Sequence, residues 1–421
     1  MADASAPDEL DAYLASGRRT AYVGFDPTAD SLHIGSLLPL LTLRRLQLAG
    51  HRPIVLIGGG TGLIGDPSGK VGERQLNPTE IVATWADRLK RQVARFVDFD
   101  AGASAAILAD NHDWLSRLEV IPFLRDIGKH FSVGAMIARE SVRARLGRPE
   151  AGISFTEFAY QVLQAYDFLE LRRRHDCTIQ LGGTDQWGNI TAGIDLIRRV
   201  DGISAYGITL PLVTKSDGSK FGKTESGTVW LDPARTSAYE MYQYWLNTAD
   251  ADTVTYLKSF TFLTPQEIEA LAEAERRAPE KREAQRVLAR EVTRLVHGAD
   301  KLAEAERITD ALFSGEIAGL TESQLQNAFR GVPTTPITPQ ELPGLALVDL
   351  VARTPLAESK RRARELVSTG AIHVNGREVR DPATVLGPDD VLHGRYVVLR
   401  RGKKSYQVVT LAVESAKRTG T

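Results

Sequence analysis

The chain has 421 residues, of which 43% are hydrophobic and 25% are charged, a composition that predicts a soluble globular protein of two or three domains. The formal net charge of −1 argues against a protein that coats nucleic acid with its whole surface, although a local basic face stays possible. The single cysteine, Cys177, excludes disulfides within the chain and any zinc site built from several cysteines. We expect a cytoplasmic protein, because the sequence has neither a secretory signal nor an apolar run of membrane-spanning length.

Residues 20–58 have the pattern of a parallel strand–helix–strand unit. Residues 20–25 read as a strand, residues 34–48 repeat apolar side chains at a helical period, and residues 53–58 read as the next strand. In such a unit a ligand lies beyond the carboxyl ends of the strands, against the helix N-terminus. The residues expected there are Asp26, Thr28, His33 and Gly35.

This set suggests chemistry on a nucleotide phosphate. Thr28 and His33 can donate hydrogen bonds to phosphate oxygens as negative charge develops on them, and Gly35 lets a nucleotide lie against the backbone. The simpler alternative for His33, taken alone, is that it caps the helix or lies on the surface.

The glycine-rich segment GGGTGLIGDPSGK, residues 58–70, partly matches two phosphate-binding motifs. A Walker loop would need glycine where Ile64 stands and Ser or Thr where Val71 stands, so this motif fails. It has the glycine spacing of a dinucleotide site, but the loop continues where the helix of that motif should begin, and Asp66 would repel a pyrophosphate. We therefore expect Asp66 to pair with a substrate ammonium group.

The middle of the chain predicts further helices and strands. Residues 78–99 read as an amphipathic helix and residues 105–108 as a strand. Residues 120–146 mix apolar and basic side chains, which fits either a helical pair on a dimer surface or an ordinary packed helix. Residues 153–171 read as a helix capped by Thr156.

That last helix carries a polar stripe. Tyr160, Gln164 and Asp167 stand at positions i, i+4 and i+7, on one face. A solvated face would be expected to carry more Lys and Glu, so we favour a polar pocket.

Two more strands and a lysine-containing loop follow. Residues 177–181 read as a strand that places Asp185 and Gln186 at its carboxyl end, and residues 208–213 read as another strand. Residues 214–227, TKSDGSKFGKTESG, form either an exposed hairpin loop or a mobile loop whose lysines close over a leaving pyrophosphate.

The remainder predicts a helical region and a small basic domain. Residues 237–329 have a helical pattern, residues 332–344 hold four prolines and read as a semi-rigid linker, and Asn375–Gly376 signals a hairpin in the last part. Two basic clusters in that part favour contact with nucleic acid over a merely solvated surface. Besides Arg362, the clusters hold the residues expected to bind RNA: Lys360, Arg361, Arg364, Arg400, Arg401, Lys403 and Lys404.

Taken together, these motifs resemble the bacterial tyrosyl-tRNA synthetase family of class I aminoacyl-tRNA synthetases, from about residue 20 to about residue 411. The most specific stretches are GFDPTADSLHIG, GLIGDPSGK, ISFTEF, LQAYDFL, GGTDQWGNITAG and KFGKTESGT. The resemblance implies an α/β protein: a Rossmann-like parallel-sheet catalytic domain (1–232), an α-helical domain on the anticodon side (233–331), the proline-rich linker (332–344) and a small α+β RNA-binding domain (345–421).

The resemblance also implies the reaction and its partners. The enzyme would activate L-tyrosine with ATP, giving tyrosyl-adenylate and pyrophosphate, and then transfer tyrosine to the 3′ end of tRNA(Tyr). It would be a homodimer and would use Mg²⁺ with the ATP, without a metal site of its own. No general base is needed, because the tyrosine carboxylate is already a nucleophile.

The roles that the resemblance implies fall on numbered residues of this sequence. The tyrosine substrate would be bound by Tyr22, Asp66, Tyr160, Gln164, Asp167 and Gln180. Phosphate charge would be stabilised by Thr28, His33, Lys70, Arg74, Lys220 and Lys223. ATP would be bound by Asp26, Gly35, Ser36, Gly182, Asp185, Gln186, Lys220, Phe221, Gly222, Lys223 and Thr224.

The sequence departs from the family pattern at Ser36, where the first motif usually has His or Asn. Three other classes of protein share parts of this pattern. The related tryptophan enzymes share the fold, but the pair Tyr22 and Asp167 suits a substrate hydroxyl. A non-catalytic RNA-binding relative would not need His33 or the lysines. A small-molecule nucleotidylyltransferase would have no use for the basic C-terminal part.

Overall fold

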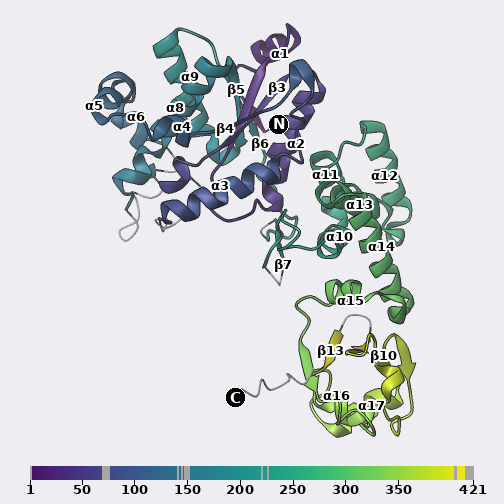
Figure 1. Cartoon of the computed structure of the whole chain (residues 1–421). Helices are drawn as coiled ribbons and strands as arrows, with labels where there is room; N and C mark the ends of the chain where they lie inside the picture. The colour runs from purple at the N-terminus through teal and green to yellow at the C-terminus, as the bar shows by residue number, and fades with distance from the viewer. Residues whose placement is uncertain are drawn as a thin grey trace, which may run out of the picture. The chain divides into compact units, whose positions relative to one another are not determined.

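The computed structural model describes residues 2–68, 76–139, 142–143, 146, 152–219, 221–224, 227–402 and 405–412. The chain divides into two compact units (Figure 1). The first unit comprises Met1–Thr236 and Ala249–Ala284, and the second comprises Ser237–Thr248 and Gln285–Thr421. In the described part of the chain, no helix combines the length and the apolar character that crossing a membrane requires.

The first unit is built on a six-stranded sheet with the order β1-β6-β5-β2-β3-β4. Its parallel strands are β2 (Thr20–Phe25), β3 (Arg52–Ile57), β4 (Ile107–Asp110), β5 (Cys177–Gly183) and β6 (Tyr206–Leu210). A short strand, β1 (Asp3–Ala4), pairs antiparallel with β6. The order of the strands reverses at β2, so chain segments that leave neighbouring strands meet at one edge of the sheet.

Helices complete the first unit. The longer ones are α1 (Pro7–Ala15), α2 (Leu37–Leu48), α3 (Thr79–Val93), α8 (Phe155–His175), α9 (Trp187–Asp201), α11 (Asp250–Phe260) and α12 (Pro265–Arg277). Among them, α2, α3, α8 and α9 contact the strands of this sheet. Shorter segments are η1 (Ile34–Ser36), η2 (Thr61–Leu63), η3 (Gly102–Ser104), α4 (His112–Leu115), α5 (Val120–Pro122), η4 (Phe123–Ile127), η5 (Gly128–His130), α6 (Val133–Ile137), η6 (Thr184–Gln186) and η7 (Pro279–Lys281). Strands β7 (Lys223–Thr224) and β8 (Gly227–Thr228) form a small hairpin.

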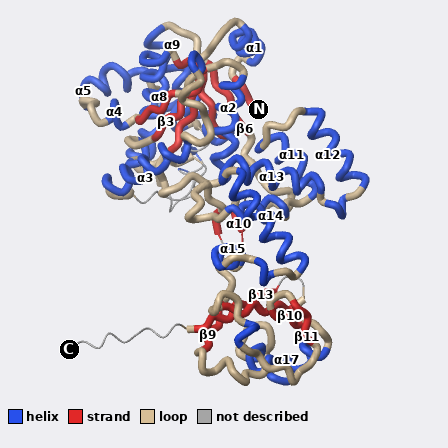
Figure 2. Tube along the Cα trace, turned by 45° about the vertical axis from the view of Figure 1, so that its right-hand side comes forward, coloured by secondary structure: helices blue, strands red, loops and turns tan. Residues whose placement is uncertain are grey.

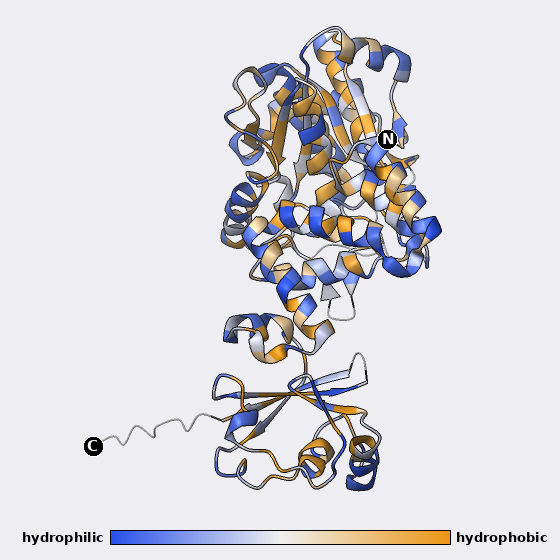
Figure 3. Ribbon diagram, turned by 90° about the vertical axis from the view of Figure 1, so that its right-hand side faces the viewer, coloured by the Kyte–Doolittle hydropathy of each residue, from blue (hydrophilic) through white to orange (hydrophobic). Residues whose placement is uncertain are grey.

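The core of the first unit is apolar and fully buried. Tyr22, Ile54 and Leu56 from the central strands pack with Phe168 of α8 and Leu196 of α9. In Figure 3 the strands of this sheet are predominantly in the hydrophobic colours, as expected for parallel strands that helices cover. The predicted α/β class and parallel sheet are confirmed.

Several predicted bounds differ from those in the structure. The helix predicted over 78–99 ends at Val93, and the strand predicted over 208–213 is Tyr206–Leu210. The latter ends before Pro211, which has no N–H to donate to a ladder. The cap predicted at Thr156 is wrong: Ser154 Oγ accepts a hydrogen bond from Glu157 N at 3.3 Å, so the helix begins at Phe155.

The second unit begins with helices and ends with a five-stranded sheet (Figure 2). Its helices are α10 (Ala238–Leu246), most of α13 (Glu283–His297), α14 (Ala299–Ser314), η8 (Ile317–Gly319), α15 (Glu322–Ala328), α16 (Leu347–Ala352), α17 (Lys360–Ser368) and η9 (Pro388–Asp390). The sheet has the order β11-β10-β12-β13-β9. Its strands are β9 (Thr334–Ile337), β10 (Ile372–Val374), β11 (Arg377–Val379), β12 (Tyr396–Arg401) and β13 (Ser405–Leu411).

Two features of this sheet bear on the sequence analysis. The hairpin at Asn375–Gly376 is confirmed: Val374 pairs with Arg377, and both turn residues have positive φ, as a type I′ turn requires. Residues 334–337, inside the stretch predicted as a linker, form β9 and pair in parallel with β13. The division into three domains stays a prediction.

Candidate active site

A cavity of about 600 Å³ opens at the carboxyl ends of the parallel strands in the first unit. Its walls include residues that follow four of these strands: Asp26 after β2, Gly58 after β3, Gly183 at the end of β5, and Pro211 after β6. This is the position expected for a ligand in an open α/β sheet. The predicted site residues that line the cavity are Tyr22, Asp26, Thr28, His33, Gly35, Ser36, Asp66, Tyr160, Gln164, Asp167, Gln180, Gly182, Asp185, Gln186 and Phe221.

The most enclosed part of the cavity lies around Tyr22, Asp167 and Gln180, each at most 2% exposed. The Tyr22 hydroxyl and Gln180 Oε1 are buried there without a hydrogen-bond partner among the described residues. Burial, and then the nearby Asp167, raise the pKa of Tyr22 well above its ordinary value, so its phenol stays protonated. A buried polar atom without a partner is costly, so this end is suited to a ligand that supplies the missing polar group.

Two residues outside the predicted set hold the Asp167 carboxylate. Trp114 Nε1 donates to its Oδ1 at 2.7 Å, and Asn111 Nδ2 donates to its Oδ2 at 2.9 Å. Burial raises the pKa of Asp167 to about 8, although these two hydrogen bonds favour the ionised form. The polar run that follows β4 in the sequence was the signal that could have identified Asn111 and Trp114.

Asp26 organises the middle of the cavity. Its Oδ2 accepts a hydrogen bond from the Tyr160 hydroxyl at 2.7 Å, and its Oδ1 accepts one from Thr61 Oγ1 at 2.7 Å. A Cβ atom on Gly58 would stand 2.0 Å from Asp26 Oδ1, so this glycine permits the close approach of the carboxylate to β3. Asp26 therefore orients Tyr160 on the polar stripe of α8.

A second carboxylate, Asp66, lies beside the polar stripe. Its Oδ1 accepts from Ser68 N at 2.8 Å, and its Oδ2 accepts from Gln186 Nε2 at 2.7 Å. Gln186 is in turn bonded by Gln164 Nε2 at 3.3 Å. The prediction that Tyr160, Gln164 and Asp167 face a polar pocket is confirmed by their place in the cavity wall.

At the opposite side, His33 both caps a helical turn and faces the cavity. Its Nδ1 accepts a hydrogen bond from Gly35 N at 3.0 Å, at the start of η1. The surrounding protein lowers the pKa of this imidazole by desolvation, so the neutral ring predominates at pH 7. Because Nδ1 accepts, the proton of the neutral ring is on Nε2, which can donate to a ligand oxygen.

The loop that carries the predicted lysines is partly described. Phe221 stacks on Phe260 of α11 with ring centroids 5.3 Å apart, and a Cβ on Gly222 would stand 2.8 Å from Ile34. Lys223 is exposed and is not among the residues that line the cavity. Of Thr224 the backbone is described, in β7. The predicted residues Lys70, Arg74 and Lys220 lie outside the described residues.

The predicted RNA-binding residues lie in the second unit. Lys360, Arg361 and Arg364 are exposed on α17, and Lys360 pairs with Asp349 at 2.8 Å. Arg400 and Arg401 lie at the end of β12. Arg401 donates to the Leu356 carbonyl at 2.7 Å, so part of its hydrogen-bonding capacity is used within the protein. Lys403 and Lys404 lie outside the described residues.

Comparison with known proteins agrees with this geometry. Residues 15–314 match the family described as tRNA synthetases class I (W and Y), and residues 324–409 match the tyrosine–tRNA ligase SYY-like C-terminal domain. The tyrosine–tRNA ligase of Aliivibrio fischeri strain MJ11 is 54% identical over 409 residues, which cover 97% of this chain and 95% of that protein. The tyrosine–tRNA ligase of Geobacillus kaustophilus is 55% identical over 406 residues, which cover 96% of each.

A solved structure extends the likeness to the fold. A C-terminally truncated mitochondrial tyrosyl-tRNA synthetase from Aspergillus nidulans superposes with a TM-score of 0.67 and 30% identity, over 73% of this chain and 90% of that one. The matches to both family descriptions and to relatives over nearly the whole chain lead to one conclusion. The chain belongs to the tyrosine–tRNA ligase family of class I tRNA synthetases.

Proposed function

We propose that the chain activates L-tyrosine with ATP and transfers the tyrosyl group to the 3′ end of tRNA(Tyr). The observation that carries this proposal is the enclosed end of the cavity, where the Tyr22 hydroxyl and Gln180 Oε1 are buried without partners beside Asp167. A tyrosine phenol placed there would both donate and accept hydrogen bonds. Phenylalanine would leave the same buried groups unpaired, which is costly.

In the proposed first step, a carboxylate oxygen of tyrosine attacks the α-phosphorus of ATP. The bond from that phosphorus to the bridging oxygen of the β-phosphate breaks, and pyrophosphate leaves with its electron pair. Asp66, Tyr160 and Gln164 hold the substrate ammonium group, since they combine a carboxylate with polar side chains on one wall of the cavity. His33 donates through Nε2 to the phosphate, together with Thr28, as charge develops there.

The nucleotide would occupy the wider side of the cavity. Gly35, Ser36 and Gly182 offer backbone there, and Asp26, Asp185 and Gln186 offer acceptors and an amide. The phosphate-binding roles of Lys70, Arg74, Lys220 and Lys223, and the ATP-binding roles of Phe221, Gly222 and Thr224, are proposals that rest on the family motif. We propose that Mg²⁺ enters with the phosphates of ATP.

In the second step, a terminal ribose hydroxyl of the tRNA attacks the tyrosyl carbonyl carbon. The bond from that carbon to the phosphate oxygen breaks, AMP leaves with the electron pair, and the hydroxyl proton is released. Exposed basic side chains of α17 and the end of β12 support RNA binding by the second unit, because lysine and arginine neutralise backbone phosphates. We also propose a cytoplasmic location.

A homodimer is proposed as the working assembly. The short helices α5, η4 and α6 expose a set of apolar side chains. These side chains contact water in a single copy of the chain, and a dimer interface would bury them. The members of this set are Val120 (69% exposed), Ile121 (72%), Leu124 (53%), Val133 (60%) and Ile137 (43%). Light scattering coupled to size exclusion would test this proposal, and a monomer at micromolar concentration would contradict it.

The experiment that tests the function is amino-acid-dependent ATP–pyrophosphate exchange, run with each proteinogenic amino acid in turn. Exchange that depends on tyrosine alone supports the proposal, and charging of tRNA(Tyr) completes it. Exchange with tryptophan, or none with any amino acid, would contradict it. The alternatives of a non-catalytic RNA-binding relative and a nucleotidylyltransferase are not favoured, because the relatives that match across nearly the whole chain are tyrosine–tRNA ligases.

A further inference from the structure

The segment that returns from the lysine-containing loop is paired with the loop that carries His33. Ile34 N donates to the Val229 carbonyl at 3.0 Å, and Leu231 N donates to the Leu32 carbonyl at 2.8 Å. His33 and Trp230 form an antiparallel bridge between these two bonds. The position of the His33 backbone therefore depends on where the segment 229–231 lies.

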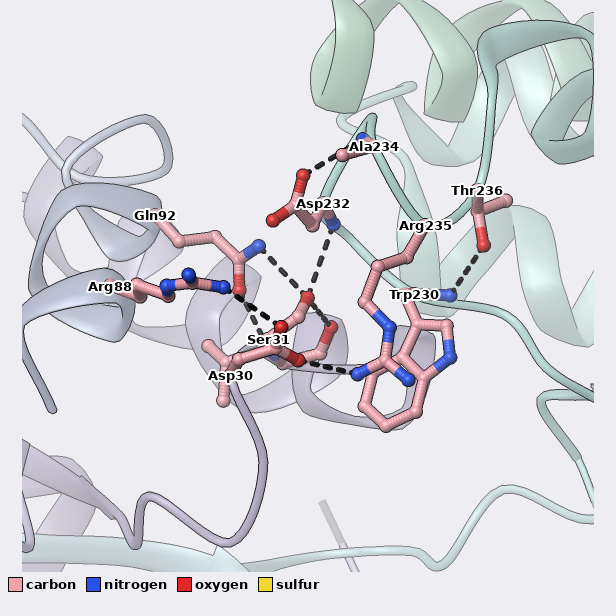
Figure 4. Close-up of polar contacts among 10 residues, drawn as sticks. Asp30, Ser31, Arg88, Gln92, Trp230, Asp232, Ala234, Arg235 and Thr236 are labelled. Carbon is pink, nitrogen blue, oxygen red and sulfur yellow. Dashed lines mark hydrogen bonds and ion pairs between the residues drawn. The ribbon is translucent and has the colours of Figure 1, made fainter. Parts of the chain in front are cut away.

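A polar network at the edge of the cavity holds these two segments together (Figure 4). Asp30 Oδ1 forms an ion pair with Arg235 Nη1 at 2.6 Å, and its Oδ2 forms a second one with Arg88 Nη1 at 2.9 Å. Ser31 Oγ accepts a hydrogen bond from Asp232 N at 3.2 Å. Arg235 and Asp232 belong to the returning segment, whereas Arg88 belongs to α3.

Arg235 makes a second contact at the same time. Its guanidinium carbon lies 3.6 Å from the centroid of the Trp230 ring, within the distance of a cation–π interaction. Trp230 lines the cavity together with His33 and Phe221. One guanidinium thus connects the Asp30 carboxylate to a side chain in the cavity wall.

An isolated ion pair on a surface contributes little, but this one is restrained on several sides. The side chains of Asp30 and Arg235 are 29% and 35% exposed. Asp30 is held by a second arginine, and the planar guanidinium is fixed by the indole that it covers. Because these contacts already restrain both side chains, the ion pair between Asp30 and Arg235 loses less side-chain conformational entropy on forming than an isolated exposed pair does.

We infer that Asp30 is a positioning residue for the nucleotide side of the cavity, acting through Arg235 on Trp230 and on the paired backbone at His33. The inference rests on the proposed function. Asp30 and Arg235 are absent from the cavity wall, so they act without touching substrate. The tyrosine side is independent of them, because Tyr22, Asp167 and Gln180 are positioned by β2, α8 and β5.

The test compares Arg235→Met and Asp30→Asn with the matched control Arg88→Met, which removes the other ion pair of the same carboxylate. Each protein is assayed for tyrosine-dependent ATP–pyrophosphate exchange at varied ATP, for tyrosine binding by equilibrium dialysis, and for its melting temperature. We expect Arg235→Met and Asp30→Asn to lower kcat/KM for ATP by about fivefold or more. Tyrosine Kd should stay within about twofold in all variants, and Arg88→Met should keep its ATP parameters within about twofold.

Rescue provides a further arm. Arg235→Lys keeps the charge that pairs with Asp30 but loses the planar contact with the indole, so its kcat/KM for ATP should fall between those of Arg235→Met and the parent. Unchanged ATP parameters in Asp30→Asn and Arg235→Met would overturn the inference. An equal loss in Arg88→Met, or a parallel loss of tyrosine binding, would overturn it too, since either would indicate general destabilisation. A parent protein without exchange would instead overturn the proposed function, and this inference with it.

Discussion

Trp114 donates its indole N–H to Asp167 Oδ1 over 2.7 Å, inside a core where both side chains are at most 5% exposed. The carboxylate that the sequence assigned to substrate recognition is therefore oriented by a residue from the end of another strand. A hydrogen bond is directional, so it sets the orientation of this buried carboxyl group as well as satisfying one of its oxygens. The geometry of the enclosed end of the cavity, where we propose that tyrosine binds, thus depends on α4 as well as on α8.

Replacement of Trp114 by Phe is expected to weaken tyrosine binding by roughly tenfold, because it leaves one oxygen of a buried carboxyl group without its partner, at a cost of about 1–3 kcal/mol, while the aromatic volume stays largely filled. Equilibrium dialysis with tyrosine measures the change. KM for ATP, determined at saturating tyrosine, serves as the control and should stay within about twofold. Unchanged tyrosine affinity would mean that Asn111 alone suffices to orient the carboxylate.

The raised pKa of Asp167 predicts a pH-dependent stability of the unliganded protein. Burial raises the pKa of this carboxyl from 3.8 to about 8, so between these values the native state holds a proton that the unfolded state has lost. The contribution of Asp167 to the free energy of unfolding is therefore complete below pH 3.8, the pKa of this carboxyl in the unfolded chain. It decreases as pH rises and is lost once pH passes about 8. The variant Asp167→Asn lacks this titration.

The measurement is the melting temperature of the parent minus that of Asp167→Asn, taken from about pH 5 to about pH 8.5. The difference should become less favourable to the parent as pH rises, because only the parent has the Asp167 carboxyl, which ionises more readily in the unfolded chain. The effects of all other titrating groups cancel in the difference. A difference independent of pH would indicate that Asp167 is ionised throughout this range.

Gly58→Ala is expected to disturb the Asp26 network. The new Cβ would stand 2.0 Å from Asp26 Oδ1 and 2.5 Å from Thr61 Oγ1, so the carboxylate must move and release Tyr160. We expect a loss of about 1–3 kcal/mol in the free energy of unfolding and a lower exchange rate. Urea denaturation and pyrophosphate exchange measure the two effects. Gly319→Ala, where a Cβ meets nothing within 4 Å, is the matched control.

Reversal of charge on α17 is expected to separate the two steps of the reaction. In Arg361→Glu/Arg364→Glu, KM for tRNA(Tyr) should rise by roughly tenfold or more through lost phosphate contacts, and the effect should shrink at high salt. Pyrophosphate exchange should not change. The control Arg277→Ala alters an exposed arginine of α12 that pairs with Glu273 at 2.7 Å. Equal charging by the parent and the α17 variant would exclude this face from RNA binding.

Many residues of the candidate site could be predicted, because local sequence patterns show where each strand ends. In a parallel sheet, the residues that follow the strands then gather at one edge. The strand at Thr20–Phe25 was predicted with its observed bounds, and its neighbours carry their polar residues to the same edge. The polar stripe of Tyr160, Gln164 and Asp167 could be identified from helical spacing. The cap at Ser154 was missed because Thr156 has the same capping chemistry, and sequence alone does not distinguish two candidates so close together.

The sequence by itself determined the family, the parallel α/β fold, the side chains at the strand ends and the Asn375–Gly376 hairpin, since each of these follows from residues close together in the chain. Tertiary structure alone decided which distant groups meet. Trp114 and Asn111 reach Asp167 across more than 50 residues of chain, and Asp30 pairs with Arg235 across 205 residues. Such contacts depend on how the strands are ordered and how the helices pack, because no local pattern records the partner of a side chain that the fold brings in from elsewhere.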